Sequence, residues 1–404
     1  MNRFTILAAC AFFLALPLAG QRQPVALTLD EALERARRSS PSVVLARMQI
    51  DEARARVAGA SLLLSSNPSL EIETGRRTGE SSSTDYGLEV SQELDLPGRR
   101  GARIDAARAV VTQEEQRARD AEREALHEIA TTFLRAVEAS ERAVATESAR
   151  LLAEETLRIA ESRYAAGDVA QLDVNLARTA VAHAEADVRI ANATLTGHVT
   201  HLQILLGMTD PVNIVGSLHE SDIVPTADLL LRAWDRPEVR VLDALIEEAE
   251  AERRIARTLR WPDFGLRAAY ESEEGDRIVR GGVGFTLPFF NRGQEAAAVA
   301  SARLERLRVQ RDAVTRKVEA EIRGAAATYD GLRAVAAEYE RTVIPLIEEN
   351  ERLALESYEV GQIGLADLLL VRREALEARR SLIDQLIETR LAEADLRAAA
   401  GVWK

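Results

Sequence analysis

The feature that most constrains the fold is a motif that occurs twice in this 404-residue chain. SRYAAGDVAQLDVNLAR at 162–178 and SYEVGQIGLADLLLVR at 357–372 each interrupt a helical pattern with a glycine that follows a tyrosine and precedes an aspartate. The matched positions all lie 194 residues apart: Tyr164 and Tyr358, Gly167 and Gly361, Asp173 and Asp367, Arg178 and Arg372. A repeat of this length is a tandem duplication rather than a solenoid.

The duplication continues outside these motifs, because Asn67-Pro68 in the first half parallels Trp261-Pro262 in the second. Each half therefore reads as one module. The predicted organisation is a signal peptide at 1–20, a first structural repeat at 21–206, a junction at 207–226 and a second structural repeat at 227–404.

Each half carries a helical stretch of unusual length, at about 99–165 and about 292–356. At 1.5 Å per residue, roughly 65 residues extend roughly 100 Å, which exceeds the diameter of an ordinary domain. Both stretches are dense in alanine, which lets helix backbones approach closely, and they carry Glu and Arg at i,i+4 spacing. We expect them to pack lengthwise on neighbouring helices.

A shorter helix is expected to return after each glycine turn, at about 172–206 and about 365–399. Gly167 and Gly361 then lie at the far tips of two long helical hairpins. Pro345 is expected to break or kink the second long helix, because proline lacks the N–H group that an interior helical position donates.

Shorter elements precede each long helix. Thr28 offers a hydroxyl cap ahead of acidic residues, which predicts a short helix from about Asp30, and a second helix is predicted at about 42–64. Segments at about 69–94 and about 263–289 alternate between apolar and polar residues on either side of a polar loop. This alternation predicts one β-hairpin in each half.

The alternation assigns Phe264, Leu266 and Phe285 to one face of the strands, and charged residues such as Glu89 and Arg267 to the other. Four such strands leave two edges unpaired, which lipid does not tolerate. Closed membrane barrels start at about eight strands and turn their apolar residues outward. Several chains would therefore complete one barrel, and a trimer gives twelve strands. The competing interpretation is a pair of soluble hairpins that cap a coiled coil.

Charge and composition narrow the classes of function. The formal net charge is −13, and Arg and Glu are interspersed along the helices rather than gathered in a basic stripe, which argues against a nucleic-acid partner. Residues 1–20 combine Arg3 with an apolar run, as secretory signals do. The only cysteine, Cys10, lies in this segment within a partial match to a lipidation box, and we favour a cysteine that is discarded with the signal.

The sequence contains no motif of a catalytic site: no Gly-x-Ser-x-Gly, no phosphate loop and no His-Glu-x-x-His. We therefore expect neither an enzyme nor a cofactor. His198 and His201 share a helix, but two ligands do not make a metal site. Asp173 and Asp367 fall in the first turns of the returning helices, where a carboxylate is favourable to the helix dipole.

Taken in order, the elements resemble the TolC family of outer-membrane efflux channels. The resemblance covers nearly all of the mature chain and is carried by Leu27-Thr-Leu-Asp-Glu-Ala-Leu, Asn67-Pro68, Ser91-Gln92, Leu96-Pro97-Gly98-Arg99-Arg100-Gly101, Leu287-Pro-Phe-Phe-Asn-Arg-Gly293 and the two tip motifs. It implies a mainly α fold with a small β part. Long antiparallel helical hairpins would form a periplasmic α-barrel, and four strands per chain would contribute to a twelve-stranded outer-membrane β-barrel of a homotrimer.

The resemblance also implies partners and site residues. The tips would dock a periplasmic adaptor, or membrane fusion protein, and face an inner-membrane pump, and they contain Tyr164, Gly167, Tyr358 and Gly361. The residues expected to contact outer-membrane lipid are Phe264, Leu266 and Phe285. Asp367, and with it Asp173, would lie at the narrow periplasmic entrance, where three copies of Asp367 would form a ring that attracts cations.

The segment from Ser91 to Arg103 looks most like the heavy-metal-efflux (CzcC/CusC-type) branch of the family. The expected function is thus a passive outer-membrane channel of a tripartite system, with an RND-type pump that exports heavy-metal cations. Multidrug efflux and type I secretion are the alternatives within the family. A soluble periplasmic coiled-coil adaptor or scaffold is the alternative of another class, and it would require the hairpins to lie on protein rather than lipid.

Overall fold

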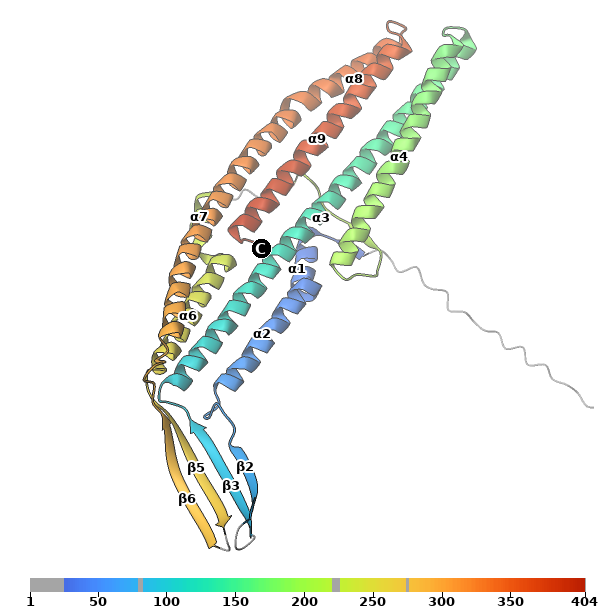
Figure 1. Ribbon diagram of the computed structural model, residues 1–404. Coiled ribbons are helices and arrows are strands. Elements are labelled where there is room, and N and C mark those ends of the chain that lie inside the picture. The colour runs from blue at the N-terminus through green and yellow to red at the C-terminus, as the bar shows by residue number, and fades with distance from the viewer. Residues whose placement is uncertain (1–24, 79–82, 220–225, 274–275, 404) are drawn as a thin grey trace, which may run out of the picture.

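The computed structural model describes residues 25–78, 83–219, 226–273 and 276–403. Within them the chain is a long, curved bundle of helices with a four-stranded sheet at one end and two helical turns at the other (Figure 1). The predicted signal peptide at 1–20, Cys10 and part of the predicted junction, 220–225, lie outside the described residues.

From α2 (Pro41–Ala60) in the first half and from α6 (Pro237–Thr258) in the second, the chain follows the same order of helix, β-hairpin, long helical stretch and returning helix. The first contains β1 (Val25–Leu27), α1 (Leu29–Ser39), α2 (Pro41–Ala60), β2 (Ser69–Arg77), β3 (Ser83–Leu94), α3 (Arg99–Ala166) and α4 (Gln171–Leu205). The connecting part contains β4 (Val212–Ile214), α5 (Thr226–Leu230) and the short η1 (Ala233–Asp235). The second contains α6 (Pro237–Thr258), β5 (Asp263–Glu273), β6 (Asp276–Thr286), α7 (Gln294–Glu338), η2 (Tyr339–Val343), α8 (Ile344–Glu359) and α9 (Leu365–Ala400).

The start of the first helix follows from its cap. The Thr28 hydroxyl accepts a hydrogen bond from the Glu31 backbone N–H at 3.3 Å, and the Glu31 carboxylate accepts one from the Thr28 N–H at 2.9 Å. This reciprocal pair satisfies two backbone donors that a helix start leaves free. The next helix, α2, ends at Ala60, so its predicted end near residue 64 was wrong. Residues 61–66 form a turn followed by bends, and they lead through Ser65 and Ser66 to Pro68.

The predicted long helices are present, and the predicted interruption at Pro345 is confirmed. α3 runs for 68 residues without a break, whereas the second long stretch divides into α7, η2 and α8. η2 is a π-helical turn, and Pro345 is the second residue of α8. The wider π turn accommodates the absent proline N–H and the bulk of the ring, which an unbroken α-helix would not.

Lengthwise packing unites the halves. α3 packs on α2 and then α4, and in the same way α7 packs on α6 and then α9. α3 also contacts α6 and α9, so among the helices it makes the main contact between the two repeats. The main apolar core lies near the middle of the bundle, where Ile129, Phe133 and Val137 of α3 meet Leu202 of α4 and Ile387 of α9.

The sheet is antiparallel throughout, with the strand order β2-β3-β5-β6. β3 pairs with β5 from Leu94 opposite Phe264 to Tyr86 opposite Ser272, so the two predicted hairpins lie side by side. β6 ends at Thr286 rather than at the expected residue 289, because Pro288 cannot donate to the ladder. The polar sequence RRTGESSS at 76–83 was expected to form the whole loop of the first hairpin, but β2 extends to Arg77 and β3 begins at Ser83. Residues 79–82 lie outside the described ranges.

Structure in the middle of the chain was not predicted. β1 pairs with β4 in parallel and ties the first described residues to the segment after α4. The Arg236 side chain is 3% exposed and donates to the carbonyl oxygens of Ala398, at 3.2 Å, and Ala399. These carbonyls belong to the last turn of α9, whose acceptors lack partners within the helix.

We predict different costs for the same replacement at two equivalent glycines. Gly98 (φ +88°) and Gly293 (φ +72°) are the N-caps of α3 and α7, and both adopt the left-handed conformation that costs other residues about 1–2 kcal/mol. An added Cβ at Gly98 meets no atom within 4 Å, whereas at Gly293 it lies 2.6 Å from the Leu259 Cβ and 2.9 Å from the Ala256 carbonyl oxygen.

Gly293→Ala should therefore lower the free energy of unfolding by roughly 1–3 kcal/mol more than Gly98→Ala does. Thermal unfolding of the purified protein, followed by circular dichroism, measures the difference. Equal melting temperatures for the two variants would contradict the close contact between the start of α7 and the end of α6.

Candidate functional site: the uncovered sheet and the helical tips

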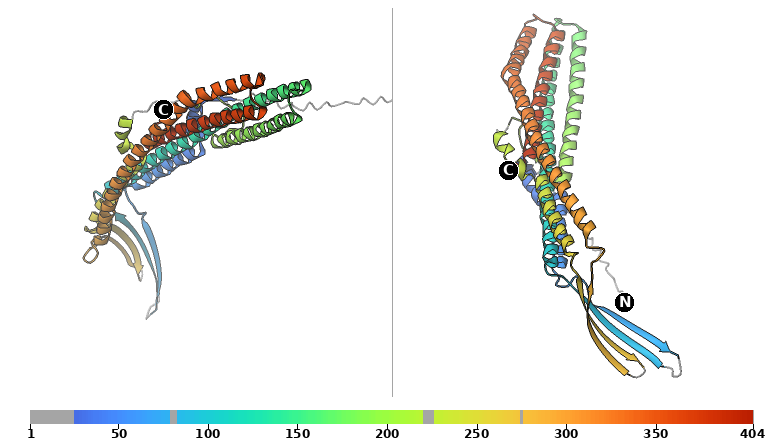
Figure 2. Two further views of the ribbon diagram at one scale, coloured as in Figure 1. Left: turned by 90° about the horizontal axis from the view of Figure 1, so that it is seen from above. Right: turned by 60° about the vertical axis from the view of Figure 1, so that its left-hand side comes forward.

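The sheet carries its apolar side chains on one face. Phe264, Leu266 and Phe285 share this face and are 41%, 48% and 60% exposed. The neighbouring strands extend the face with further exposed apolar residues: Leu70, Ile72, Leu88, Val90 and Val283. Both views in Figure 2 show the four strands as one curved layer that stands clear of the helices. A contiguous apolar surface of this kind marks an interaction with lipid or with another protein.

The opposite face is charged and predominantly acidic. An open hollow of about 310 Å³ extends over it, with Glu71, Glu73, Glu89 and Glu271 among the lining residues. Two cross-strand ion pairs offset part of this charge, Arg267 with Glu89 at 3.0 Å and Arg280 with Glu271. The sheet thus separates an apolar surface from a hydrophilic one, as a strand between lipid and water does.

The two edges of the sheet are open. β2 pairs only with β3, and β6 pairs only with β5, among the residues that the structure describes. Each edge therefore presents a row of backbone N–H and C=O groups that need partners. In a bilayer such groups must be satisfied by further strands, because no water reaches them there.

At the other end of the molecule, the two glycines close the helical turns with the same geometry. Gly167 has φ +85° and Gly361 has φ +77°. The N–H after each glycine reaches back to a helical carbonyl, Asp168 to Arg163 at 2.9 Å and Gln362 to Ser357 at 2.8 Å. These contacts form a Schellman-type end, which requires the left-handed backbone that glycine adopts at little cost.

The two tip tyrosines are not equivalent, although the repeat matches them in sequence. Tyr164 is 46% exposed, whereas Tyr358 is 1% exposed. The Arg163 guanidinium lies 4.9 Å from the centre of the Tyr358 ring and donates to the Tyr358 carbonyl oxygen at 2.9 Å. Arg163 therefore joins the first tip to the second, and only the first tip presents its tyrosine to solvent in the single chain.

A second arginine strengthens the same junction. Arg372 donates to the Leu152 carbonyl oxygen at 2.7 Å and to the Thr156 hydroxyl. Burial lowers the pKa of its guanidinium, and nearby Glu351 and Glu155 act in the opposite direction. Its repeat partner Arg178 instead pairs with Glu161 at 2.8 Å on the surface of its own hairpin. Sequence reasoning matched the two arginines but missed this difference and missed Arg163.

The two tip aspartates also differ. Asp367 is exposed, and its Oδ2 accepts a hydrogen bond from the Gly364 N–H at 3.2 Å, so it caps the start of α9. Asp173 occupies the matching third position of α4 and is partly buried. Asp367 thus has the helix-start role, and its charge remains at the surface of the tip.

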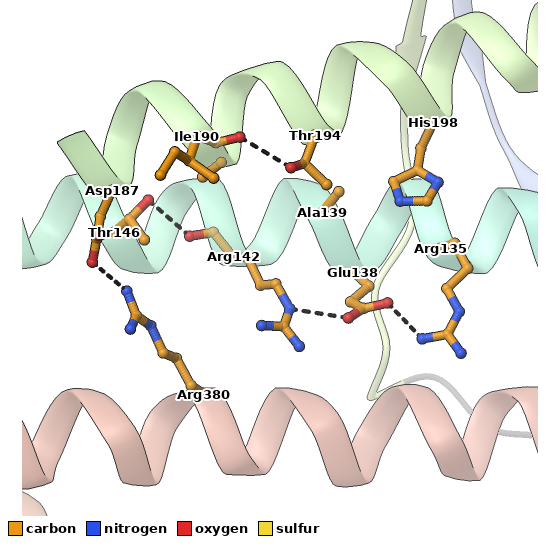
Figure 3. A pocket seen from close by; sticks show the side chains of 11 residues that line it. Arg135, Glu138, Ala139, Arg142, Thr146, Asp187, Ile190, Thr194, His198 and Arg380 are labelled. Carbon is orange, nitrogen blue, oxygen red and sulfur yellow. Dashed lines mark hydrogen bonds and ion pairs between the residues drawn. The ribbon is translucent and has the colours of Figure 1, made fainter. Parts of the chain in front are cut away.

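A cavity of about 330 Å³ lies farther along the bundle between α3, α4 and α9 (Figure 3). Glu138 accepts hydrogen bonds from Arg135 and Arg142, each at 3.0 Å, and Arg380 pairs with Asp187 at 2.7 Å. Each of the three arginines therefore has a carboxylate partner, so we interpret the cluster as an ion-pair network that joins the hairpins. His198 lines this cavity, and His201 is exposed on the same helix.

Among the residues that the structure describes, no group of three or more His, Cys, Asp or Glu side chains is arranged to hold a metal ion. None of the helices in the described ranges has both the length and the hydropathy of a transmembrane span.

Comparisons with known proteins agree with this geometry. The profile of the family described as "Outer membrane efflux protein" matches residues 32–208 and 233–402, one segment in each repeat. The cobalt-zinc-cadmium resistance protein CzcC of Cupriavidus metallidurans is 25% identical over 374 residues, which cover 90% of this chain and 87% of CzcC. The probable efflux pump outer membrane protein TtgC of Pseudomonas putida is 28% identical over 282 residues, which cover 62% of this chain and 57% of TtgC.

The fold is also that of solved channels. The structure superposes on CusC with a TM-score of 0.78 at 18% identity, covering 93% of this chain and 92% of that one. It superposes on the Campylobacter jejuni CmeC outer membrane channel with a TM-score of 0.74 at 22% identity, covering 92% and 85% of the two chains. The predicted fold class, a mainly helical chain with a four-stranded sheet and two repeats, is confirmed.

These findings decide between the classes of function that the sequence left open. The family consists of channels rather than enzymes, and its members form trimers in tripartite efflux pumps. The family match and the uncovered apolar face of the sheet together exclude the soluble adaptor, because in an adaptor the hairpins would lie on protein. The chain belongs to the family of outer membrane efflux proteins, the TolC family, and is an outer-membrane channel that extends into the periplasm.

Proposed function

We propose that three copies of this chain form the passive outer-membrane channel of an RND-type pump that exports heavy-metal cations. The likeness to CzcC over 90% of the chain is the observation that supports the metal substrate. The second candidate is multidrug efflux, which the likeness to TtgC supports over a shorter part of the chain.

The open edges of the sheet are consistent with the trimer that the family forms. If β6 of one protomer pairs with β2 of the next, three sheets of four strands close a barrel of twelve. The apolar face with Phe264, Leu266 and Phe285 then contacts lipid, and the acidic face lines a watery lumen. Closure by three copies satisfies every edge, which no arrangement of a single chain does.

The tips are proposed to dock the periplasmic adaptor and to face the inner-membrane pump. Tyr164 and Gly167 form the exposed first tip. In the second tip, Tyr358 is buried and its ring is covered by the Arg163 side chain. An adaptor would therefore meet two different surfaces in each protomer. Asp367, and to a smaller extent Asp173, is proposed to line the entrance between the tips.

The substrate can be tested by deleting the gene for this chain from its own organism. We expect the deletion strain to become sensitive to cobalt, zinc and cadmium and to accumulate these ions, with little change in its sensitivity to antibiotics and toluene. A plasmid copy should restore metal resistance. Sensitivity to antibiotics or toluene without sensitivity to metals would instead support multidrug efflux.

The same assay tests the tips. A plasmid copy that combines Gly167→Val with Gly361→Val should assemble trimers but fail to restore resistance, because valine disfavours the positive φ of both turns. Gly197→Val is the matched control, since Gly197 is an exposed position within α4 with no atom within 4 Å of an added Cβ. Full resistance from the double tip variant would remove the docking role.

Adjacent alanines in β5 test the orientation of the sheet. Ala268 lies on the apolar face opposite Val90, and Ala269 lies on the acidic face opposite Glu89. Ala268→Arg should hinder barrel assembly, because an arginine that faces lipid near the bilayer midplane costs about 2–4 kcal/mol. Ala269→Arg should assemble normally. The yield of heat-resistant trimer in outer-membrane fractions measures both, and the reverse order of yields would invert the assigned faces.

Asp367→Asn tests the proposed entrance. An asparagine side-chain oxygen can still accept the hydrogen bond from the Gly364 N–H, so this replacement removes the charge and keeps the cap. We expect weaker cation preference in planar bilayers and weaker block by multivalent cations added from the periplasmic side. Asp173→Asn should have a smaller effect. Identical selectivity and block in the protein with and without Asp367→Asn would reduce this residue to its capping role.

A further inference from the structure

An open hollow of about 520 Å³ lies at the helix-proximal end of the sheet, where α6 leads into β5 and β3 leads into α3. The wall residues used below are Leu96, Pro97, Arg257, Arg260, Trp261 and Phe264. Because β3 and β5 are the two central strands, the hollow is remote from the edges at which protomers of the proposed trimer pair. In the proposed trimer, pairing of the edge strands of neighbouring protomers therefore does not cover it.

One side of the hollow is aromatic. Trp261 is 64% exposed and Phe264 is 41% exposed, and the Phe264 ring contacts that of Phe285 with a centroid distance of 6.3 Å. Phe289 and Phe290, which follow the end of β6, are 66% and 94% exposed. Tryptophan in particular favours the boundary between lipid and water, because its ring is apolar while its N–H needs a polar partner.

The other side of the hollow is basic. Arg257 and Arg260 are exposed, and neither guanidinium group has a hydrogen bond or an ion pair with any residue of the described ranges. The neighbouring carboxylate of Asp263 is already paired with Arg99 at 2.9 Å, and Arg99 also donates to the Thr258 hydroxyl at 3.1 Å. Arg99 thereby joins the start of α3 to the end of α6 and the start of β5. Among the described residues, the guanidinium groups of Arg257 and Arg260 remain without a carboxylate partner at the hollow.

We propose that this hollow binds an anionic phospholipid of the periplasmic leaflet. The phosphate lies between Arg257 and Arg260, whose planar guanidinium groups can each donate two hydrogen bonds to it. The acyl chains lie over Trp261 and Phe264 and continue along the apolar face of the sheet. The assignment depends on the proposed position of the sheet in the membrane, in which the end nearest the helices is the periplasmic one.

Fluorescence quenching tests the contact directly, because Trp261 is one of only three tryptophans. A protein with Trp234→Phe and Trp403→Phe is reconstituted in phosphatidylethanolamine vesicles that contain phosphatidylglycerol, with brominated acyl chains on one lipid or the other. We expect brominated phosphatidylglycerol to quench Trp261 several-fold more strongly than brominated phosphatidylethanolamine at equal mole fraction. Arg257→Gln combined with Arg260→Gln should bring this ratio close to one.

The matched control removes two arginines elsewhere. Arg306 and Arg316 are exposed on α7, and Arg306→Gln with Arg316→Gln makes the same change in net charge without touching the hollow. This control should keep the lipid preference. A preference that survives the replacement of Arg257 and Arg260, equal quenching by both lipids, or no quenching by either lipid in conducting protein would each overturn the proposal.

A second measurement keeps all three tryptophans. Mass spectrometry of trimers extracted with their bound lipid should find less retained phosphatidylglycerol per trimer after replacement of Arg257 and Arg260 than after replacement of Arg306 and Arg316. Equal retention in the two variants would count against the site. The proposed function has a separate readout, since protein that forms no conducting channel in the same vesicles contradicts the membrane channel itself.

Discussion

Close packing along α3 is the interaction on which the rest of the structure depends. This helix buries a series of alanines, among them Ala102, Ala109, Ala118 and Ala125, and small side chains allow neighbouring backbones to approach closely. α3 contacts helices of both repeats, so the relative position of the two hairpins is fixed along its length. The position of α3 also determines how the two β-hairpins lie side by side, because β3 leads directly into α3 and pairs with β5 of the second repeat.

Much of this fold could be predicted from periodicity and from the repeat. The long helices, the hairpins, the glycine turns and the break at Pro345 depend on local pattern, which a single sequence displays. The three-residue strands β1 and β4 are too short to show a period, and they pair across most of the first repeat. The link from Arg236 to the end of α9 was missed for a related reason, since the groups that it contacts there are backbone carbonyls, which carry no sequence signal.

In the functional surfaces too, the features set by local pattern could be predicted from the sequence, and those set by long-range contacts could not. Alternation was sufficient to place Phe264, Leu266 and Phe285 on one face, because side-chain direction follows the strand period. Repeat symmetry suggested equal tips, yet Tyr164 is exposed and Tyr358 is buried. The sequence repeat predicts the structure within each module, whereas the burial of a side chain also depends on contacts with the other module. Arg163 lies beside Tyr358, and the residue that matches Arg163 in the second repeat is Ser357, which cannot form the same contact.

The π-helical turn before Pro345 gives the two repeats different mechanical properties. α3 spans the distance from the sheet to the first tip as one continuous rod, so a force applied at its tip is carried along its whole length. The corresponding path in the second repeat contains η2, where the backbone hydrogen-bond ladder changes its spacing. We therefore expect bending of the second hairpin to concentrate at η2, whereas the continuous α3 offers no such point in the first hairpin.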